Sequence, residues 1–171
     1  MIKVIDHLDR VFGESQPINT KDPLESLLCA SMVVLPLAHV YQTKSIKHLR
    51  WNVQRSNAED VEWLHNVARD AEQDWRVLNE VVGIWYQHAD VNRLSYVSIN
   101  NEATIVSAQE IKNTFELLQS KNRLALNRTK ATAIGLWECA HKAFYLSPFF
   151  WSKIIKRVSS VWNWLVSSCE D

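Results

Sequence analysis

The chain has 171 residues, of which 47% are hydrophobic and 22% charged, and its formal net charge is zero. This length suits a core that needs no disulfide or metal, and we expect residues 1–171 to form a single domain. A net charge of zero removes the simplest argument for a nucleic-acid-binding protein. Three glycines and four prolines are few. Because these residues mark turns, the composition predicts long helices with few connections.

The cysteines, the N-terminal residues and the longest uncharged run bear on the cellular compartment of the protein. Cys29, Cys139 and Cys169 are an odd number, lie far apart and include no CxxC pair, which argues against a disulfide or zinc framework. Charged residues follow the first methionine closely, so no signal peptide is expected. The longest nearly uncharged run, residues 26–42, contains Pro36 and is short for a membrane span. These features predict a soluble cytoplasmic protein and disfavour membrane contact.

The first third of the chain is predicted to be helical. A short amphipathic helix is marked by Ile2, Ile5, Leu8 and Phe12. The sequence Asp22-Pro23-Leu24-Glu25 predicts a helix start, because the Asp side chain caps backbone N–H groups and proline fits the first turn. The apolar helix that follows is expected to extend to about Gln42, with a kink at Pro36. Residues 44–55 are expected to form a basic, partly exposed helix.

A long helix over residues 61–89 is expected to be the centre of the fold. Its apolar positions recur every three or four residues: Val61, Leu64, Ala68, Ala71, Trp75, Leu78, Val82, Trp85 and Ala89. The capping-box pattern at residues 56–59 is typical of a helix start. The polar side of this segment is strongly acidic.

The second half of the chain is predicted to contain one hairpin and three helices. Residues 96–106 allow a small β-hairpin. A capping box at residues 107–110 predicts the start of a helix, and residues 124–146 form another with one apolar face. That face carries Ala131, Ile134, Trp137, Ala140 and Phe144. Ser147-Pro148 begins the last helix. The predicted fold class is therefore all-α, a bundle of five to seven helices with room for this hairpin.

Known catalytic motifs are missing from the sequence. The glycines stand alone at positions 13, 83 and 135, which excludes a glycine-rich phosphate loop or dinucleotide fingerprint. Neither G-x-S-x-G nor HExxH occurs. We therefore expect a non-enzymatic protein that uses no cofactor.

The leading hypothesis is a protein–protein interaction module, of the adaptor, inhibitor or immunity type, from a bacterium or phage. Eight tryptophans motivate it, since buried aromatic anchors dominate the energetics of interfaces. The partner-binding residues are predicted on the last helix: Trp151, Ile155, Trp162 and Trp164. The same apolar stripe suits a homodimer seam, so the partner is expected to be another protein or a second copy.

A second hypothesis is nucleic-acid binding by two basic patches. Positive side chains would neutralise phosphates, and an exposed tryptophan would stack on an unpaired base. The residues in question are Lys44, Lys47, Arg50 and Trp51 in the first patch, and Lys121, Arg123, Arg128 and Lys130 in the second.

A third hypothesis is a ferritin-like metal site. Such sites combine carboxylates with Glu-x-x-His pairs on two helices of a bundle. Two pairs have this spacing, Glu62 with His65 and Glu138 with His141. Against a metal site, Glu62 lies away from the predicted core stripe of its helix.

Overall fold

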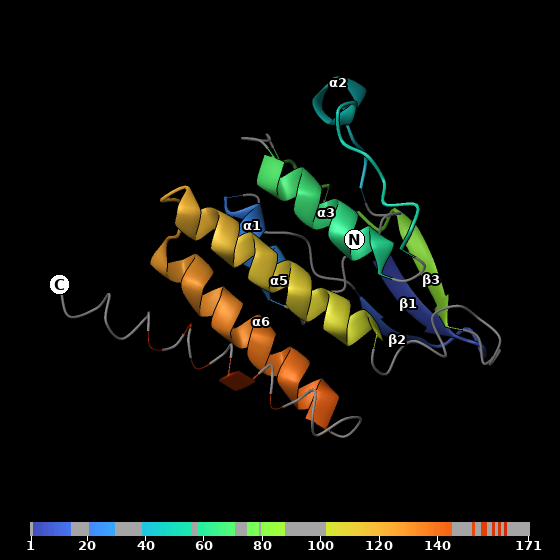
Figure 1. Cartoon of the computed structure of the whole chain (residues 1–171). Coiled ribbons are helices and arrows are strands. Elements are labelled where there is room, and N and C mark those ends of the chain that lie inside the picture. The colour runs from blue at the N-terminus through green and yellow to red at the C-terminus, as the bar shows by residue number, and fades with distance from the viewer. Residues whose placement is uncertain are drawn as a thin grey trace.

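The computed structural model of this chain is mostly helical, with a small three-stranded sheet at one side (Figure 1). It describes residues 2–14, 21–29, 39–55, 58–70, 75–78, 80–87 and 102–144, together with residues 152, 155, 156, 159, 161 and 163. The elements are β1 (Ile2–Asp6), β2 (Val11–Glu14), α1 (Pro23–Leu28), α2 (Thr43–Ile46), α3 (Glu59–Asp70), β3 (Gly83–Gln87), α5 (Glu102–Ser120) and α6 (Leu126–Phe144). Within these residues, no helix is both long enough and apolar enough to cross a membrane.

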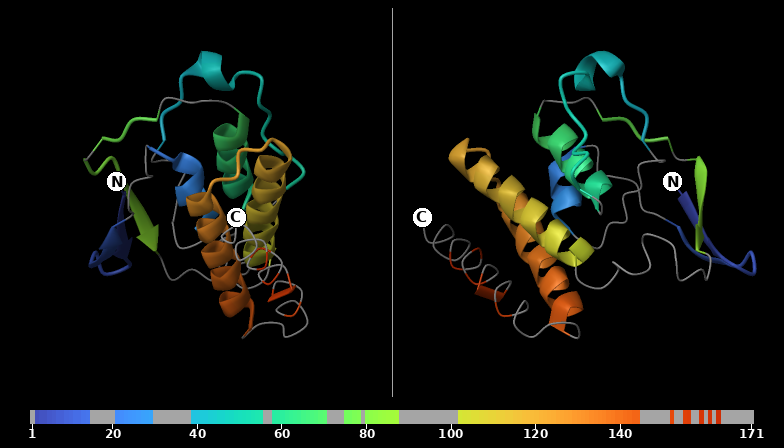
Figure 2. Two further views of the ribbon diagram at one scale, coloured as in Figure 1. Left: turned by 90° about the vertical axis from the view of Figure 1, so that its left-hand side faces the viewer. Right: turned by 45° about the vertical axis from the view of Figure 1, so that its right-hand side comes forward.

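The helices share one hydrophobic core. Helices α5 and α6 form a helical hairpin, α1 packs on α6, and α3 packs on α5. Figure 2 shows these helices grouped together, with the sheet to one side of them. The core consists of Leu24, Leu27, Leu28, Leu64, Ala68, Ala108, Ile111, Phe115, Leu118, Ala131, Ala133, Leu136, Cys139, Ala140 and Val161. Val161, close to the C-terminal end of the described residues, is also part of this core.

The turn between α5 and α6 shows how the sequence ends a helix here. Asn122 adopts a positive φ of 52°, a conformation that asparagine tolerates better than most residues. The N–H of Arg123 donates to the carbonyl of Leu118 at 2.8 Å, and the N–H of Asn122 donates to the carbonyl of Gln119 at 3.0 Å. This pair of bonds is a Schellman motif, which satisfies carbonyls at the helix end. The chain then reverses direction into α6.

The predicted start of α1 is confirmed. A carboxylate oxygen of Asp22 accepts a hydrogen bond from the N–H of Glu25 at 3.1 Å, and proline occupies the first turn. The predicted length is wrong, because α1 ends at Leu28 and residues 39–42 are not helical. Pro36 lies outside the described residues. Residues 44–55 are also less helical than predicted, since α2 ends at Ile46.

The predicted amphipathic helix at the N-terminus is wrong, because this segment forms the hairpin of β1 and β2. One carboxylate oxygen of Asp6 accepts hydrogen bonds from the N–H groups of Leu8 and Arg10, which closes the turn. The Arg10 side chain bonds the same carboxylate and lowers the pKa of Asp6 to about 2. Strand β1 also pairs in parallel with β3, a contact that local helical spacing cannot reveal.

The predicted long helix over residues 61–89 is wrong beyond Asp70, where α3 ends. Residues 75–78 are not helical, and residues 83–87 form strand β3. Segment 81–87 is rich in β-branched and aromatic residues, which pack well on a pleated sheet. Pairing with β1 therefore outweighs the helical spacing of Val82 and Trp85.

The hairpin predicted at residues 96–106 is contradicted in its second half. Thr104, Ile105 and Val106 belong to α5, which begins at Glu102 rather than near residue 108. Residues 96–101 lie outside the described part of the chain. Helix α6 confirms the helix predicted at 124–146, but its apolar face is not uniformly buried, since Ile134 and Trp137 are 51% and 54% exposed. The fold is thus mostly helical, and the small sheet departs from an all-α bundle.

Candidate functional site

One face of the sheet carries apolar side chains that are open to solvent. The strand order is β2-β1-β3, and the register pairs Ile5 with both Val11 and Tyr86. Lys3 is paired with both Glu14 and Ile84. Directly paired residues point to the same side of a sheet, so these side chains share one face. We call Lys3, Ile5, Val11, Glu14, Ile84 and Tyr86 the open face.

Four of the six residues of the open face are apolar or aromatic, whereas the solvent-facing side of a sheet is usually polar. Ile84 is 59% exposed and Val11 is 55% exposed, while Ile5 is half-buried. The opposite face carries Ile2, which is fully buried. The apolar exposure continues along the chain into β3 through Val77, Leu78, Val81 and Val82. Exposed apolar residues that gather on one surface mark an interaction site more often than singly scattered ones do.

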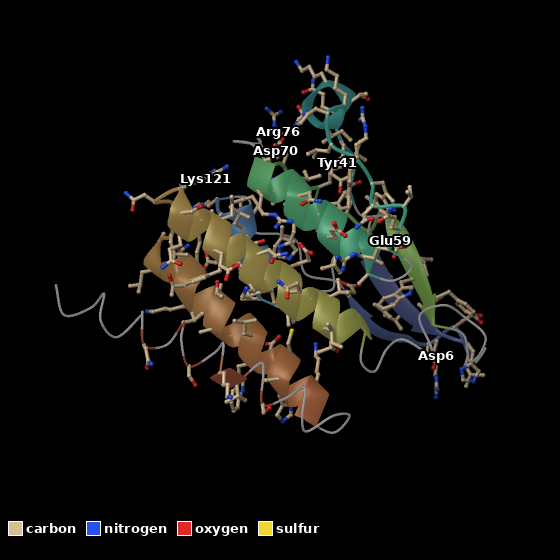
Figure 3. The ribbon with its side chains drawn as sticks, in the orientation of Figure 1. Asp6, Tyr41, Glu59, Asp70, Arg76 and Lys121 are labelled. Carbon is tan, nitrogen blue, oxygen red and sulfur yellow. The ribbon has the colours of Figure 1, made fainter. Side chains whose placement is uncertain are left out.

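A second candidate surface is the segment 39–55, which lies across α3. Its Trp51 packs on Trp63 of α3, with 5.4 Å between ring centroids and 37° between ring planes. Trp63 in turn meets Tyr41 edge-on at 6.2 Å. Trp51 remains 43% exposed, so the outermost ring of this aromatic cluster is accessible. Figure 3 shows Tyr41 between α2 and α3, and the side chains of α2 extending away from the helices.

The cations of this segment fall into two groups. Lys44, Lys47 and Arg50 are exposed, and within the described residues none of them forms an ion pair. The guanidinium of Arg50 donates to the backbone carbonyls of Lys47 and Leu49, at 2.7 and 3.0 Å. Arg55, in contrast, pairs with Glu62 of α3. Lys44, Lys47 and Arg50 are therefore accessible to a ligand, whereas the charge of Arg55 is neutralised within the protein.

A buried charge network fastens this segment to α3 and α5. Glu110, whose side chain is 4% exposed, pairs with Arg69 at 3.0 Å and with Arg55 at 3.6 Å. The amide of Asn52 donates to both carboxylate oxygens of Glu62, at 3.1 and 3.3 Å. Buried carboxylates in such a position need these partners, since an isolated charge is costly to bury. The network thereby fixes the backbone just after Trp51.

His65 lies in the same interface and remains neutral. Its Nδ1 shares a 2.8 Å hydrogen bond with the hydroxyl of Thr114, and both residues are buried. Burial, and to a lesser extent the nearby Arg69 cation, lower the pKa of His65 to about 3. The hydrogen bond joins α3 to α5, so we interpret His65 as a structural residue of this helix contact.

Two residues of the hypothetical metal site, Glu62 and His65, have other side-chain partners. Glu62 is occupied by Arg55 and Asn52, and His65 by Thr114. Both members of the other pair are on α6, where His141 is exposed. In the parts of the chain that the structure covers, no group of three or more potential metal ligands comes together.

Part of the second predicted basic patch is neutralised by an ion pair within the protein. The Nε of Arg128 donates to a carboxylate oxygen of Asp22 at 2.8 Å, and another guanidinium nitrogen donates to the carbonyl of Arg123. Burial would raise the pKa of Asp22, but the hydrogen bonds from Arg128, the Glu25 backbone and Asn127 outweigh it and lower that pKa. Lys121 and Lys130 are exposed, and Arg123 is half-buried. Figure 3 places Lys121 at the α5–α6 turn, at the opposite end of the helices from the sheet.

Of the predicted partner-binding residues, one is described. Ile155 is half-buried and packs against the core of its own chain. Trp151, Trp162 and Trp164 lie outside the described residues.

Sequence reasoning missed two features of these surfaces. It assigned Ile84 and Tyr86 to a helix, although the β-branched and aromatic residues of segment 81–87 favour a strand. It also missed that Trp63 supports Trp51, and no sequence signal connects these two rings.

The chain was compared with known proteins as a whole. No protein-family model, curated protein or solved structure matches it.

Proposed function

We propose that this protein is a non-enzymatic binding module that docks another protein on the open face and on the edge formed by β3. The observation that carries the proposal is the exposure of Ile84 and Val11 on one face of the sheet. Apolar area left in water contributes nothing to folding, whereas covering it by a partner stabilises a complex. The occupant is a protein segment in extended conformation, which adds to β3 as a further strand.

The sequence around β3 supports an extended partner. Within the described residues, β3 pairs with β1 alone and is an outer strand of the sheet. Natural edge strands are usually protected against pairing by lysine or proline, and residues 77–87 contain neither. Their one charged residue is Glu80. An apolar strand at an edge, without such protection, is suited to β-strand addition.

Helix α6 offers a competing apolar surface at Ile134 and Trp137, both more than half exposed. The backbone of a helix satisfies its own hydrogen bonds, so this surface provides side chains alone. Lys130 and His141, also exposed, lie one turn before and after it. The sheet offers both apolar side chains and a strand edge, and it is therefore the preferred site.

The test is affinity capture from native lysate with three isoleucine-to-lysine variants, after nuclease treatment. Ile84→Lys places a charge on the open face, Ile134→Lys does the same on α6, and Ile105→Lys is the control on α5, where the isoleucine is 40% exposed. We expect Ile84→Lys to lose a stoichiometric protein partner that the wild type and the other two variants retain. Thermal unfolding of each variant checks that the fold is intact.

Several outcomes would overturn the proposal. A partner retained by Ile84→Lys, or lost specifically by Ile134→Lys, would remove the sheet from consideration. Sedimentation velocity provides the remaining check. A dimer that dissociates in Ile84→Lys would show that the occupant is a second copy of the chain rather than another protein.

A further inference from the structure

A different surface, the segment 39–55, combines free cations with an accessible aromatic ring. Lys44, Lys47 and Arg50 occur within seven residues of the chain and have no carboxylate partner among the described residues. Arg55 at the end of this segment, and Arg69 and Arg128 elsewhere in the helical part, are each paired with a carboxylate. Cations that the fold does not neutralise are suited to an anionic ligand.

Trp51 follows these cations directly and has the geometry of a stacking platform. Trp63 supports it from α3, with ring centroids 5.4 Å apart, and Trp51 keeps 43% of its surface accessible. A planar base stacks on such a ring whatever its sequence, because every base has a π-face. A ring that is already held in place loses little conformational freedom when it binds.

The segment is fastened to α3 on both sides of this platform. Before it, the ring of His48 is hydrogen-bonded to the carboxylate of Asp70. After it, Asn52 and Arg55 both contact Glu62. The backbone that carries Arg50 and Trp51 therefore lies between two anchored points in the unbound protein.

We infer that Lys44, Lys47, Arg50 and Trp51 form a site for single-stranded nucleic acid, in which an unpaired base stacks on Trp51 and the cations contact the adjacent phosphates. A paired base lies inside the duplex stack and cannot reach the ring. Helix α2 has four residues and is too short to act as a recognition helix in a major groove. Single strands are therefore the ligand class that this site fits.

The inference is tested with the full-length protein and a fluorescein-labelled 20-nucleotide single-stranded DNA of mixed sequence, by fluorescence anisotropy. Trp51→Ala is expected to weaken binding about tenfold or more, as alanine substitution of a stacking residue does. Trp51→Phe keeps an aromatic face and should retain most of the affinity. Trp137→Ala removes a still more exposed tryptophan from α6 and should leave the affinity unchanged.

The charges are tested by two matched double reversals. Lys44→Glu/Lys47→Glu is expected to weaken binding by more than about tenfold at low salt, because each phosphate contact releases counterions. Lys121→Glu/Lys130→Glu changes the net charge by the same amount at the α5–α6 end and should have a much smaller effect. Wild-type affinity should also fall steeply as salt concentration rises.

The controls separate this site from its alternatives. Three results would each overturn the inference. The wild type does not bind the single strand, both double reversals weaken binding equally, or duplex DNA binds with equal affinity. Mononucleotides are used as competitors. Displacement at the same molar concentration as the oligonucleotide would show that the site takes a free nucleotide, which would also overturn it. Ile84→Lys should bind DNA normally, so failure here and failure of the protein-docking proposal are distinguishable.

Discussion

The core between the helices and the open face of the sheet place their apolar residues in opposite environments. In the helices, Leu28, Ile111 and Leu136 are at most 1% exposed, whereas Ile84 and Val11 in the sheet are more than half exposed. Burial of apolar area stabilises a fold by roughly 25 cal/mol per Å². The buried residues of the helices gain this stabilisation within the monomer. The open face gains this stabilisation only when something covers the sheet, and this difference is the basis of the proposed docking surface.

Within the helical part, charged residues also divide into a buried, paired group and an exposed, unpaired group. Glu110, Arg69 and Arg55 satisfy one another between the helices, while Lys44 and Lys47 have no ion-pair partner within the described residues. Charges that are paired and buried belong to the fold. Charges that are unpaired and exposed are free to contact a ligand.

The largest effect is expected in the charge network of the helical part. Glu110→Ala leaves Arg69 and Arg55 without their shared carboxylate in a largely buried site, and should cost about 4 kcal/mol of unfolding free energy. Urea unfolding monitored by circular dichroism measures it. Glu116 provides the control, because it forms an exposed pair with Lys112, and Glu116→Gln should cost less than about 0.5 kcal/mol. Similar losses in both variants would contradict a structural role of the network.

A pair of apolar truncations compares the two regions directly. Leu28→Ala removes a fully buried side chain from α1 and should cost about 3 kcal/mol. Ile84→Ala acts on the open face and should change the unfolding free energy by no more than about 0.5 kcal/mol. Chemical denaturation of both variants in the same buffer gives the comparison. A large loss in Ile84→Ala would mean that the open face supports the monomer, and the proposed docking role would lose its basis.

The smallest effect concerns pH. The pKa of His65 is lowered to about 3 in the folded protein, against 6.5 as its ordinary value. The unfolded chain therefore binds a proton between these values and the folded chain does not, so stability falls as the pH drops below 6.5. At pH 5, this residue should account for a loss of about 2 kcal/mol relative to pH 7. In His65→Asn, which does not titrate, unfolding midpoints at the two pH values should differ less. An unchanged difference would assign the pH dependence to other groups.

Local sequence was sufficient to predict several elements. The start of α1 depends on Asp22 and Pro23, which act within one helical turn. Helix α6 follows from its own apolar spacing over residues 126–144. Composition alone predicts the first basic patch, Lys44 to Trp51, because a cluster of cations beside a tryptophan can be seen in the sequence without knowing the fold.

The remaining features depend on contacts between distant parts of the chain. Helical spacing predicted helices at residues 2–12 and 83–87, but pairing of β1 with β3 made both segments strands. Their register then decided which side chains point to solvent. The sequence places Arg128 in a basic patch, but Asp22, far away in the chain, lies beside it and neutralises its charge.

The sequence by itself determined that this protein is mostly helical, where several helices start, and which segment concentrates cations next to an aromatic residue. These properties follow from interactions within one or two turns of the chain. The tertiary structure decided that Ile84 is exposed, that Arg128 is neutralised and that Trp51 has a supporting ring. Each of these depends on which distant residues meet, and the free energy of such contacts is not encoded in any local pattern.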